Sequence, residues 1–98
     1  MLKSVQTLVE HALTGNQMYY RIGNHSCDEP VLSYRKFYYH NACVCIIDTE
    51  DKTVMFDNCG WNTSSTTRTI NSYRQAFTGF HELPASEFKD IMQRRMSR

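Results

Sequence analysis

The strongest constraint on the fold of this chain is the segment at residues 42–48, near the middle of its 98 residues, which is apolar from Ala42 to Ile47 and ends at Asp48. A strand buried on both faces carries such a run, whereas a half-exposed strand alternates apolar and polar residues. A polar turn at residues 49–52 follows, and residues 53–56 return as a second apolar segment. The pattern predicts a hairpin whose first strand lies in the interior of a β-sheet.

Two further segments extend this sheet toward the N-terminus. Residues 34–40 mix aromatic and basic side chains along one strand, and Asn41 after them is a turn residue that allows a second hairpin. Residues 17–22 read as a short strand, and residues 23–30 as a polar loop. The sequence thus predicts a sheet of three or four antiparallel strands.

One amphipathic helix is expected before the sheet. Ser4 is a favourable N-cap, and Gly15 with Asn16 gives the helix a common form of C-terminus. Between them, apolar residues recur at helical spacing and form a single stripe that a sheet can cover. The stripe consists of Val5, Leu8, Val9, Ala12 and Leu13.

Two more helices are expected after the sheet. In the first, a Ser or Thr within residues 63–66 caps the N-terminus, and Gly79 ends the helix with Phe80 packed back on it. Its inward stripe is Thr66, Ile70, Tyr73 and Phe77. The second begins near Pro84 and Ser86 and ends in basic residues, which suit a helix C-terminus. Its inward residues are Phe88, Ile91 and Met92.

These elements indicate one α+β domain over residues 1–98, because runs of strands followed by runs of helices are typical of that class. We expect an N-terminal helix, a three- to four-stranded antiparallel sheet and two C-terminal helices. A net charge of +1 gives no strong overall field toward nucleic acid or membrane. No apolar run approaches the roughly 20 residues that span a bilayer, so we expect no membrane partner and a cytoplasmic protein with reduced cysteines.

Metal binding is the first chemistry to weigh, because histidines and cysteines cluster in this chain. The residues concerned are His25, Cys27, His40, Cys43, Cys45 and Cys59. Structural zinc sites use cysteine pairs two to four residues apart in tight turns. The close pair here, Cys43 and Cys45, lies in the apolar run, where both point to the same side of a strand as small core residues. We therefore expect no metal site and no cofactor.

Cysteine catalysis is the second chemistry. His25 and Cys27 share the polar loop, but the neighbouring Asp28 and Glu29 would raise the pKa of the thiol, which disfavours a nucleophilic thiolate. No signature of a cysteine or serine hydrolase surrounds these residues. The sequence therefore predicts a protein that is not an enzyme.

Residues 56–71 form a polar corner that contains the only tryptophan, Trp61. Helix N-termini bind anions, and Arg68 lies close to this one, but the hydroxyl side chains here also serve as helix caps, which we favour. Trp61 either packs beneath the corner as a core residue or lies at the surface as a contact residue. The sequence leaves both readings open.

The segment at residues 34–40 supports a nucleic-acid hypothesis. An exposed strand face with aromatic and basic side chains can stack bases and hold phosphates. The candidate residues are Tyr34, Arg35, Lys36 and Tyr38. The same aromatic residues are also common at protein interfaces, so nucleic acid is the alternative and protein binding the preferred interpretation.

Residues 56–71, which follow a predicted hairpin, also resemble small uncharacterised proteins of bacteriophages. In those proteins a strand leads through a Gly-aromatic turn into a helix start with two threonines. The likeness covers about residues 42–74. It implies a phage accessory protein that acts in the host cytoplasm by binding, and inhibiting or modulating, a host protein or a defence (anti-CRISPR-like) nucleoprotein complex. It implies no particular target and no site residue.

The preferred hypothesis is thus a small binding protein with a host protein or nucleoprotein complex as its partner. Aromatic and arginine residues usually supply the binding energy of such interfaces. The candidate contact residues are Tyr38, Trp61, Arg68 and Arg74.

Overall fold

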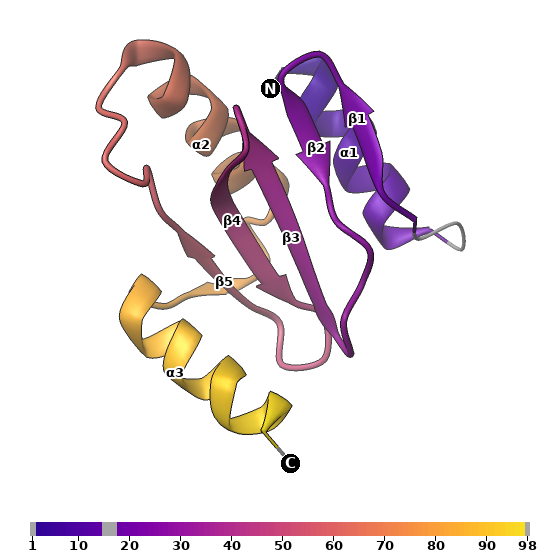
Figure 1. Ribbon diagram of the computed structural model, residues 1–98, viewed down its shortest axis with the longest axis vertical. Coiled ribbons are helices and arrows are strands. Elements are labelled where there is room, and N and C mark those ends of the chain that lie inside the picture. The colour runs from indigo at the N-terminus through magenta and orange to yellow at the C-terminus, as the bar shows by residue number, and fades with distance from the viewer. Residues whose placement is uncertain (1, 15–17, 98) are drawn as a thin grey trace.

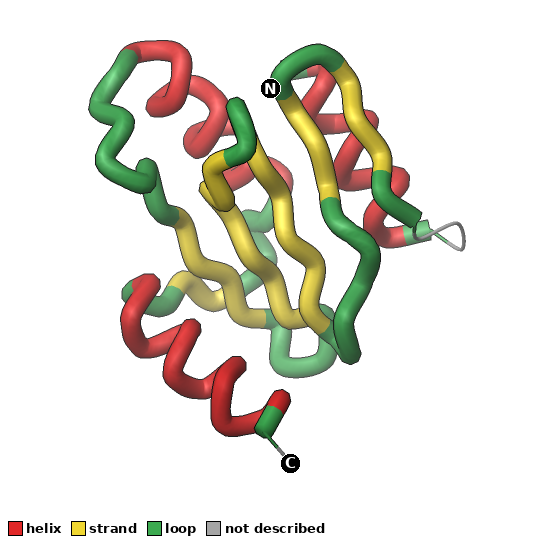
Figure 2. Tube along the Cα trace, in the orientation of Figure 1, coloured by secondary structure: helices red, strands yellow, loops and turns green. Residues whose placement is uncertain are grey.

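The computed structural model of the protein describes residues 2–14 and 18–97 as a six-stranded sheet with three helices. The helices are α1 (Lys3–Leu13), α2 (Ser64–Ala76) and α3 (Ala85–Met96). The strands are β1 (Tyr20–Ile22), β2 (His25–Cys27), β3 (Tyr34–Tyr39), β4 (Ala42–Asp48), β5 (Thr53–Phe56) and β6 (His81–Glu82). The strands lie in chain order across the sheet, as Figures 1 and 2 show. The predicted α+β class is confirmed.

The sheet has a helix layer on each face. α1 and α2 lie together on one face, behind the sheet in Figure 1, and α3 lies on the other, beside β5. The core under α1 and α2 is the larger, and its centre is Leu8, Phe37, Cys45, Ile47 and Tyr73. The smaller core under α3 consists of Tyr34, Ile46, Met55 and Phe88. β4 contributes to both, so the prediction of an interior strand buried on both faces is confirmed.

Both predicted hairpins are present. β3 and β4 pair antiparallel through a two-residue turn, in which His40 has φ 50° and Asn41 has φ 64°. Left-handed conformations at both central residues match the twist of the flanking strands. β4 and β5 pair antiparallel through the polar turn at residues 49–52. The residues of these two turns therefore determine how the three central strands, β3, β4 and β5, pair.

The predicted number of strands was wrong. The expected polar loop at residues 23–30 contains β2, which joins β1 to β3. β6 follows α2 and pairs parallel with β5, so the sheet is mixed and has six strands. Both missed strands are only two or three residues long and carry polar side chains. Pairing with a longer neighbour, which no local pattern reveals, makes them strands.

A β-bulge corrects the prediction that Cys43 and Cys45 point to the same side. β3 and β4 change register between Phe37 and Tyr38, because Phe37 pairs with Cys45 whereas Tyr38 pairs with Cys43. The additional residue, Val44, reverses the alternation of side chains along β4. Cys45 therefore lies in the larger core and Cys43 beside the smaller one.

The helix ends differ from prediction at two points. α1 begins at Lys3 without a side-chain cap, so Ser4 is not its N-cap; the backbone N–H of Leu2 instead donates to Ser72 Oγ on α2 at 3.1 Å. α2 ends at Ala76, before Gly79, although the ring of Phe80 does pack back on Phe77. The predicted end of α1 at residues 15 and 16 lies outside the described residues.

Other helix predictions are confirmed. The side chain of Thr63 caps α2 by accepting a hydrogen bond from the backbone N–H of Thr66. The inward stripe of α2, namely Thr66, Ile70, Tyr73 and Phe77, is buried. On α3, Phe88 is buried against Tyr34. None of the described helices is both long and apolar enough to cross a membrane.

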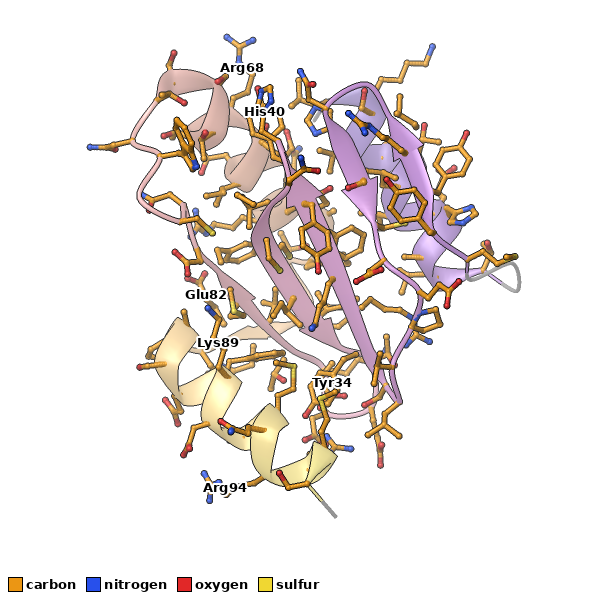
Figure 3. The ribbon with its side chains drawn as sticks, viewed as in Figure 1. Tyr34, His40, Arg68, Glu82, Lys89 and Arg94 are labelled. Atoms are coloured by element: carbon orange, nitrogen blue, oxygen red, sulfur yellow. The ribbon has the colours of Figure 1, made fainter. Side chains whose placement is uncertain are left out.

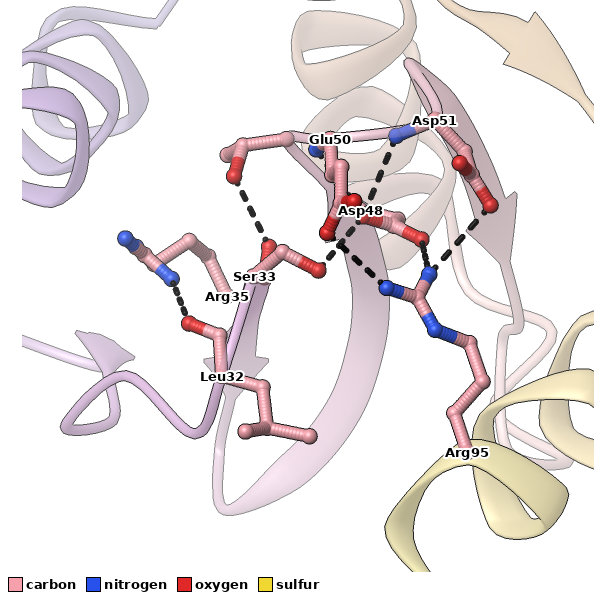
Figure 4. A network of polar contacts seen from close by, with 8 residues as sticks. Leu32, Ser33, Arg35, Asp48, Glu50, Asp51 and Arg95 are labelled. Atoms are coloured by element: carbon pink, nitrogen blue, oxygen red, sulfur yellow. Dashed lines mark hydrogen bonds and ion pairs between the residues drawn. The ribbon is translucent and has the colours of Figure 1, made fainter.

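α3 is fastened to the sheet by a polar network at the end of β4, drawn in Figure 4. The carboxylate of Asp48 is 2% exposed and accepts hydrogen bonds from Ser33 Oγ and from the backbone N–H groups of Glu50 and Asp51. The guanidinium of Arg95, from the last turn of α3, pairs with Asp48, Glu50 and Asp51. One buried carboxylate thus orders the β4–β5 turn and holds the C-terminal helix.

Candidate functional site: the Trp61 pocket

A hollow with mainly apolar walls lies where the β3–β4 hairpin meets the start of α2. We call it the Trp61 pocket; it has a volume of about 300 Å³. Its walls are Tyr39, His40, Ala42, Val44, Trp61, Thr63, Ser65 and Thr66. The floor is mainly apolar and the rim carries hydroxyl and imidazole groups. This is the usual composition of a binding site, in which apolar walls give affinity and a few polar groups give orientation.

Trp61 lies on the rim of this pocket with 59% of its surface exposed. The reading of Trp61 as a core residue beneath the corner is therefore wrong. An exposed tryptophan next to a hollow is unusual, because a residue of this size normally gains from burial. Such residues are the typical anchors of protein interfaces.

The turn before Trp61 is held by its own side chains. Asp57 accepts from the backbone N–H of Cys59 at 2.9 Å, and Asn58 accepts from that of Gly60 at 3.0 Å. The backbone N–H of Trp61 donates to the carbonyl of Asn58 at 2.8 Å. Gly60 has φ 83°, a conformation that glycine adopts without strain. The turn thus presents Trp61 in a defined position, so little ordering is needed on binding.

The surroundings of the pocket are positively polarised. The first turn of α2 contains no acidic residue, so the partial positive charge of the helix N-terminus is not neutralised by its own side chains. No side-chain hydrogen bond or ion pair joins Arg68 to another described residue. Figure 3 shows Arg68 and His40 at the same end of the molecule. Between Asp57 and Glu82 the chain carries no Asp or Glu at all.

Arg74, predicted as a contact residue, is engaged within the fold. Its guanidinium pairs with Glu82 at 3.2 Å and lies 4.7 Å from the centre of the Phe56 ring. It also donates to the side chain of Asn71. Arg74 therefore connects α2 to β5 and β6, at a distance from the pocket walls named above.

Tyr38 lies on the part of the sheet that α3 leaves uncovered. Its hydroxyl donates to Asp28 Oδ2 at 3.2 Å, and burial, with the charge of Cys43 and Asp28, raises the pKa of Tyr38 to about 12. Lys36 is on the same face, because it is two positions before Tyr38 on β3. The structure does not place Tyr38 at the Trp61 pocket.

The residues proposed for nucleic-acid binding are divided among separate environments. Tyr34 is buried in the smaller core, where its ring lies 5.9 Å from that of Phe88. Arg35 points to the opposite face of the sheet and donates to the carbonyls of Ala12 and Leu32. Only Lys36 and Tyr38 share an open surface. The alternation of side chains along β3 and the position of α3 over Tyr34 decide this division.

The histidine and cysteine candidates that the structure describes are not arranged as a set of metal ligands. No group of three His, Cys, Asp or Glu side chains within the described ranges is arranged to hold a metal ion. Cys27 is buried, and burial together with the charge of Asp28 raises the pKa of its thiol. Burial, with the nearby His40, lowers the pKa of His25, whose ring packs on Tyr39. In this arrangement the Cys27 thiol stays protonated near neutral pH.

Sequence reasoning missed most of the pocket walls. The sequence pattern places Tyr39 in a strand and Val44 in the core, and it marks His40 as a strand residue and a candidate metal ligand, but it assigns none of them to a pocket. The turn residue Asn41 was the one signal in the sequence for this wall, because a tight turn there places the tip of the hairpin beside the corner that contains Trp61.

Comparison of the chain with protein-family models, curated proteins and solved structures finds no match.

Proposed function

We propose that the protein acts by binding another protein, with the Trp61 pocket as the contact surface. The observation that carries this proposal is the tryptophan itself, 59% exposed on the rim of an apolar hollow of about 300 Å³. Interfaces obtain most of their energy from an aromatic anchor packed beside a pocket that receives an anchor from the partner. Trp61 is the anchor, and the pocket accepts one apolar side chain.

The partner segment that fits this surface is acidic. Arg68, the N-terminus of α2 and the absence of acidic residues from 58 to 81 give the rim a positive potential. Charge complementarity of this kind raises the association rate and selects among partners. We therefore assign to the pocket an apolar side chain flanked by Asp or Glu on the partner protein.

The wider role that we propose is that of a phage accessory protein which binds a host protein or a defence complex. What supports it is the resemblance of residues 42–74 described above, together with a surface suited to binding. Within this proposal Trp61 and Arg68 are the contact residues. Tyr38 forms a second, smaller contact on the open sheet face, and Arg74 stabilises the fold.

The partner is best sought by affinity capture from a bacterial lysate, with and without nuclease treatment. A captured protein that binds again after purification, without nucleic acid, supports the proposal. Capture that is lost on nuclease treatment, together with direct retention on single-stranded DNA or RNA at low salt, supports instead the nucleic-acid alternative through Lys36 and Tyr38. Binding to an acidic protein segment and binding to nucleic acid should both weaken with salt. The nuclease treatment therefore distinguishes the two.

Trp61→Ala is expected to weaken binding of the purified partner by about 30-fold, or about 2 kcal/mol, the usual size of an interface hot spot. Because Trp61 is exposed, the free energy of unfolding should change by less than about 0.5 kcal/mol. Titration calorimetry and urea unfolding measure the two quantities.

Met96→Ala is the matched control, since Met96 is also an exposed apolar residue but lies on α3. It should leave binding unchanged.

Arg68→Glu should weaken binding and reduce its dependence on salt, because it reverses the charge beside the pocket. Unchanged affinity in Trp61→Ala would contradict the proposed contact surface.

A further inference from the structure

Cys43 of β4 and Cys59 of the turn that carries Trp61 lie side by side. The thiol of Cys59 donates to the backbone carbonyl of Cys43, with an Sγ–O distance of 3.1 Å, although 16 residues separate them in the chain. Cys59 is exposed and Cys43 is partly exposed, and both are free thiols. Cys27 and Cys45 are buried. The two cysteines that are not fully buried are therefore neighbours in space.

The backbone keeps the two residues together. β4 and β5 pair antiparallel up to Cys45 and Phe56, and the ladder continues as the N–H of Asp57 donates to the carbonyl of Val44 at 3.0 Å. Cys43 lies one residue beyond Val44 on β4, and Cys59 lies two residues beyond Asp57, in the turn that follows β5. A disulfide spans Cα separations of about 4.4 to 6.8 Å, and the contact of the Cys59 thiol with the Cys43 carbonyl brings the two residues close to that range.

The β-bulge is what makes this pair available. Without it, Cys43 would point to the same side as Cys45, under α1 and α2. With it, Cys43 faces the side of the sheet that α3 only partly covers, beside the turn that contains Cys59. Cys59 has φ 54°, a left-handed conformation within the turn, and its thiol reaches the carbonyl of Cys43 near the start of β4.

We propose that Cys43 and Cys59 form a reversible intramolecular disulfide when a low-molecular-weight disulfide such as oxidised glutathione is present. The exposed Cys59 thiolate first attacks one sulfur of the oxidant, forming a mixed disulfide and releasing one glutathione thiolate. The Cys43 thiolate then attacks the Cys59 sulfur, closes the protein disulfide and releases the second glutathione. Two thiol protons and two electrons leave the protein, and one glutathione disulfide is reduced to two thiols.

The reaction should be slow near neutral pH. Burial raises the pKa of Cys43 to about 11, and burial together with the charge of Asp57 raises the pKa of Cys59. Since the thiolate is the reacting form, the rate should rise with pH, roughly tenfold per unit while the thiols remain mostly protonated. The closed disulfide would fix the turn two residues before Trp61. This inference is independent of what the Trp61 pocket binds.

The test is to incubate the reduced, purified protein with oxidised glutathione at pH 7.5 and 8.5, block free thiols, and map peptides by mass spectrometry without reduction. We expect a monomer in which a peptide containing residue 43 is linked to one containing residue 59, more rapidly at the higher pH. Reduction should restore the free thiols.

Three variants make the result specific. Cys59→Ser and Cys43→Ser should each abolish the intramolecular link, with Cys43→Ser trapping a glutathione adduct on Cys59. Cys27→Ser should leave the link unchanged, because Cys27 is buried elsewhere. A wild-type protein that stops at the Cys59–glutathione adduct, or forms dimers through Cys59, would overturn the proposal.

Discussion

Asp48→Ala is expected to lower the free energy of unfolding by about 3 kcal/mol, a large part of the 5 to 15 kcal/mol typical of a domain this size. The change removes the acceptor for Ser33 Oγ and for two backbone N–H groups, and it removes the buried partner of Arg95. Buried donors left without an acceptor pay their full desolvation cost. Urea unfolding followed by circular dichroism measures the loss.

The contribution of Asp48 should depend on pH in a defined direction. Burial alone raises the pKa of this carboxyl, but hydrogen bonds from Ser33 and the backbone, with the charge of Arg95, together lower it below its usual value. A lowered folded-state pKa means that the stabilisation is present above the unfolded pKa of about 4. It is lost as the pH falls through the folded-state pKa.

The stability difference between wild type and Asp48→Asn should therefore shrink as the pH is lowered from 7 to below 4. Asp51→Asn is the matched control, since Asp51 pairs with the same arginine but is exposed. It should cost less than about 1 kcal/mol, as exposed ion pairs do. Equal losses for the two positions would show that the buried carboxylate is not what secures α3.

Phe37→Ala is expected to cost about 3 to 5 kcal/mol. Phe37 is fully buried at the centre of the larger core, with its ring 4.9 Å from that of Tyr73 and 5.7 Å from that of Phe77. Truncation leaves a cavity between β3 and α2 that the surrounding rings cannot fill without leaving their packed positions. Thermal and urea unfolding should both show the loss.

Two comparisons separate cavity formation from damage to the strand. Phe37→Leu retains most of the volume and should cost less than about 1.5 kcal/mol. Tyr38→Ala changes the next residue of β3, whose side chain lies on the opposite, partly exposed face. It should cost less than Phe37→Ala; a similar or greater loss would mean that strand propensity, rather than core packing, decides stability here.

The candidate site was predicted only in part. The sequence identified the corner at residues 56–71 and both of its surface candidates, Trp61 and Arg68, but it left Trp61 undecided between core and surface. Its exposure depends on the hydrogen bonds of the Asp57–Trp61 turn and on the hairpin tip that forms the opposite wall. Because those two segments are distant in sequence, the residue pattern of neither one predicts the pocket that they form together.

The sequence by itself determined the features that depend on local periodicity and turn chemistry: the interior strand β4, the two central hairpins, the stripe of α2 and its Thr63 cap. The tertiary structure alone decided which faces were covered. α3 buries Tyr34 and brings Arg95 to Asp48, 47 residues away, while the bulge at Val44 turns Cys43 from Cys45. The physical reason is that a residue's type and spacing specify its element, whereas its exposure depends on where distant elements dock.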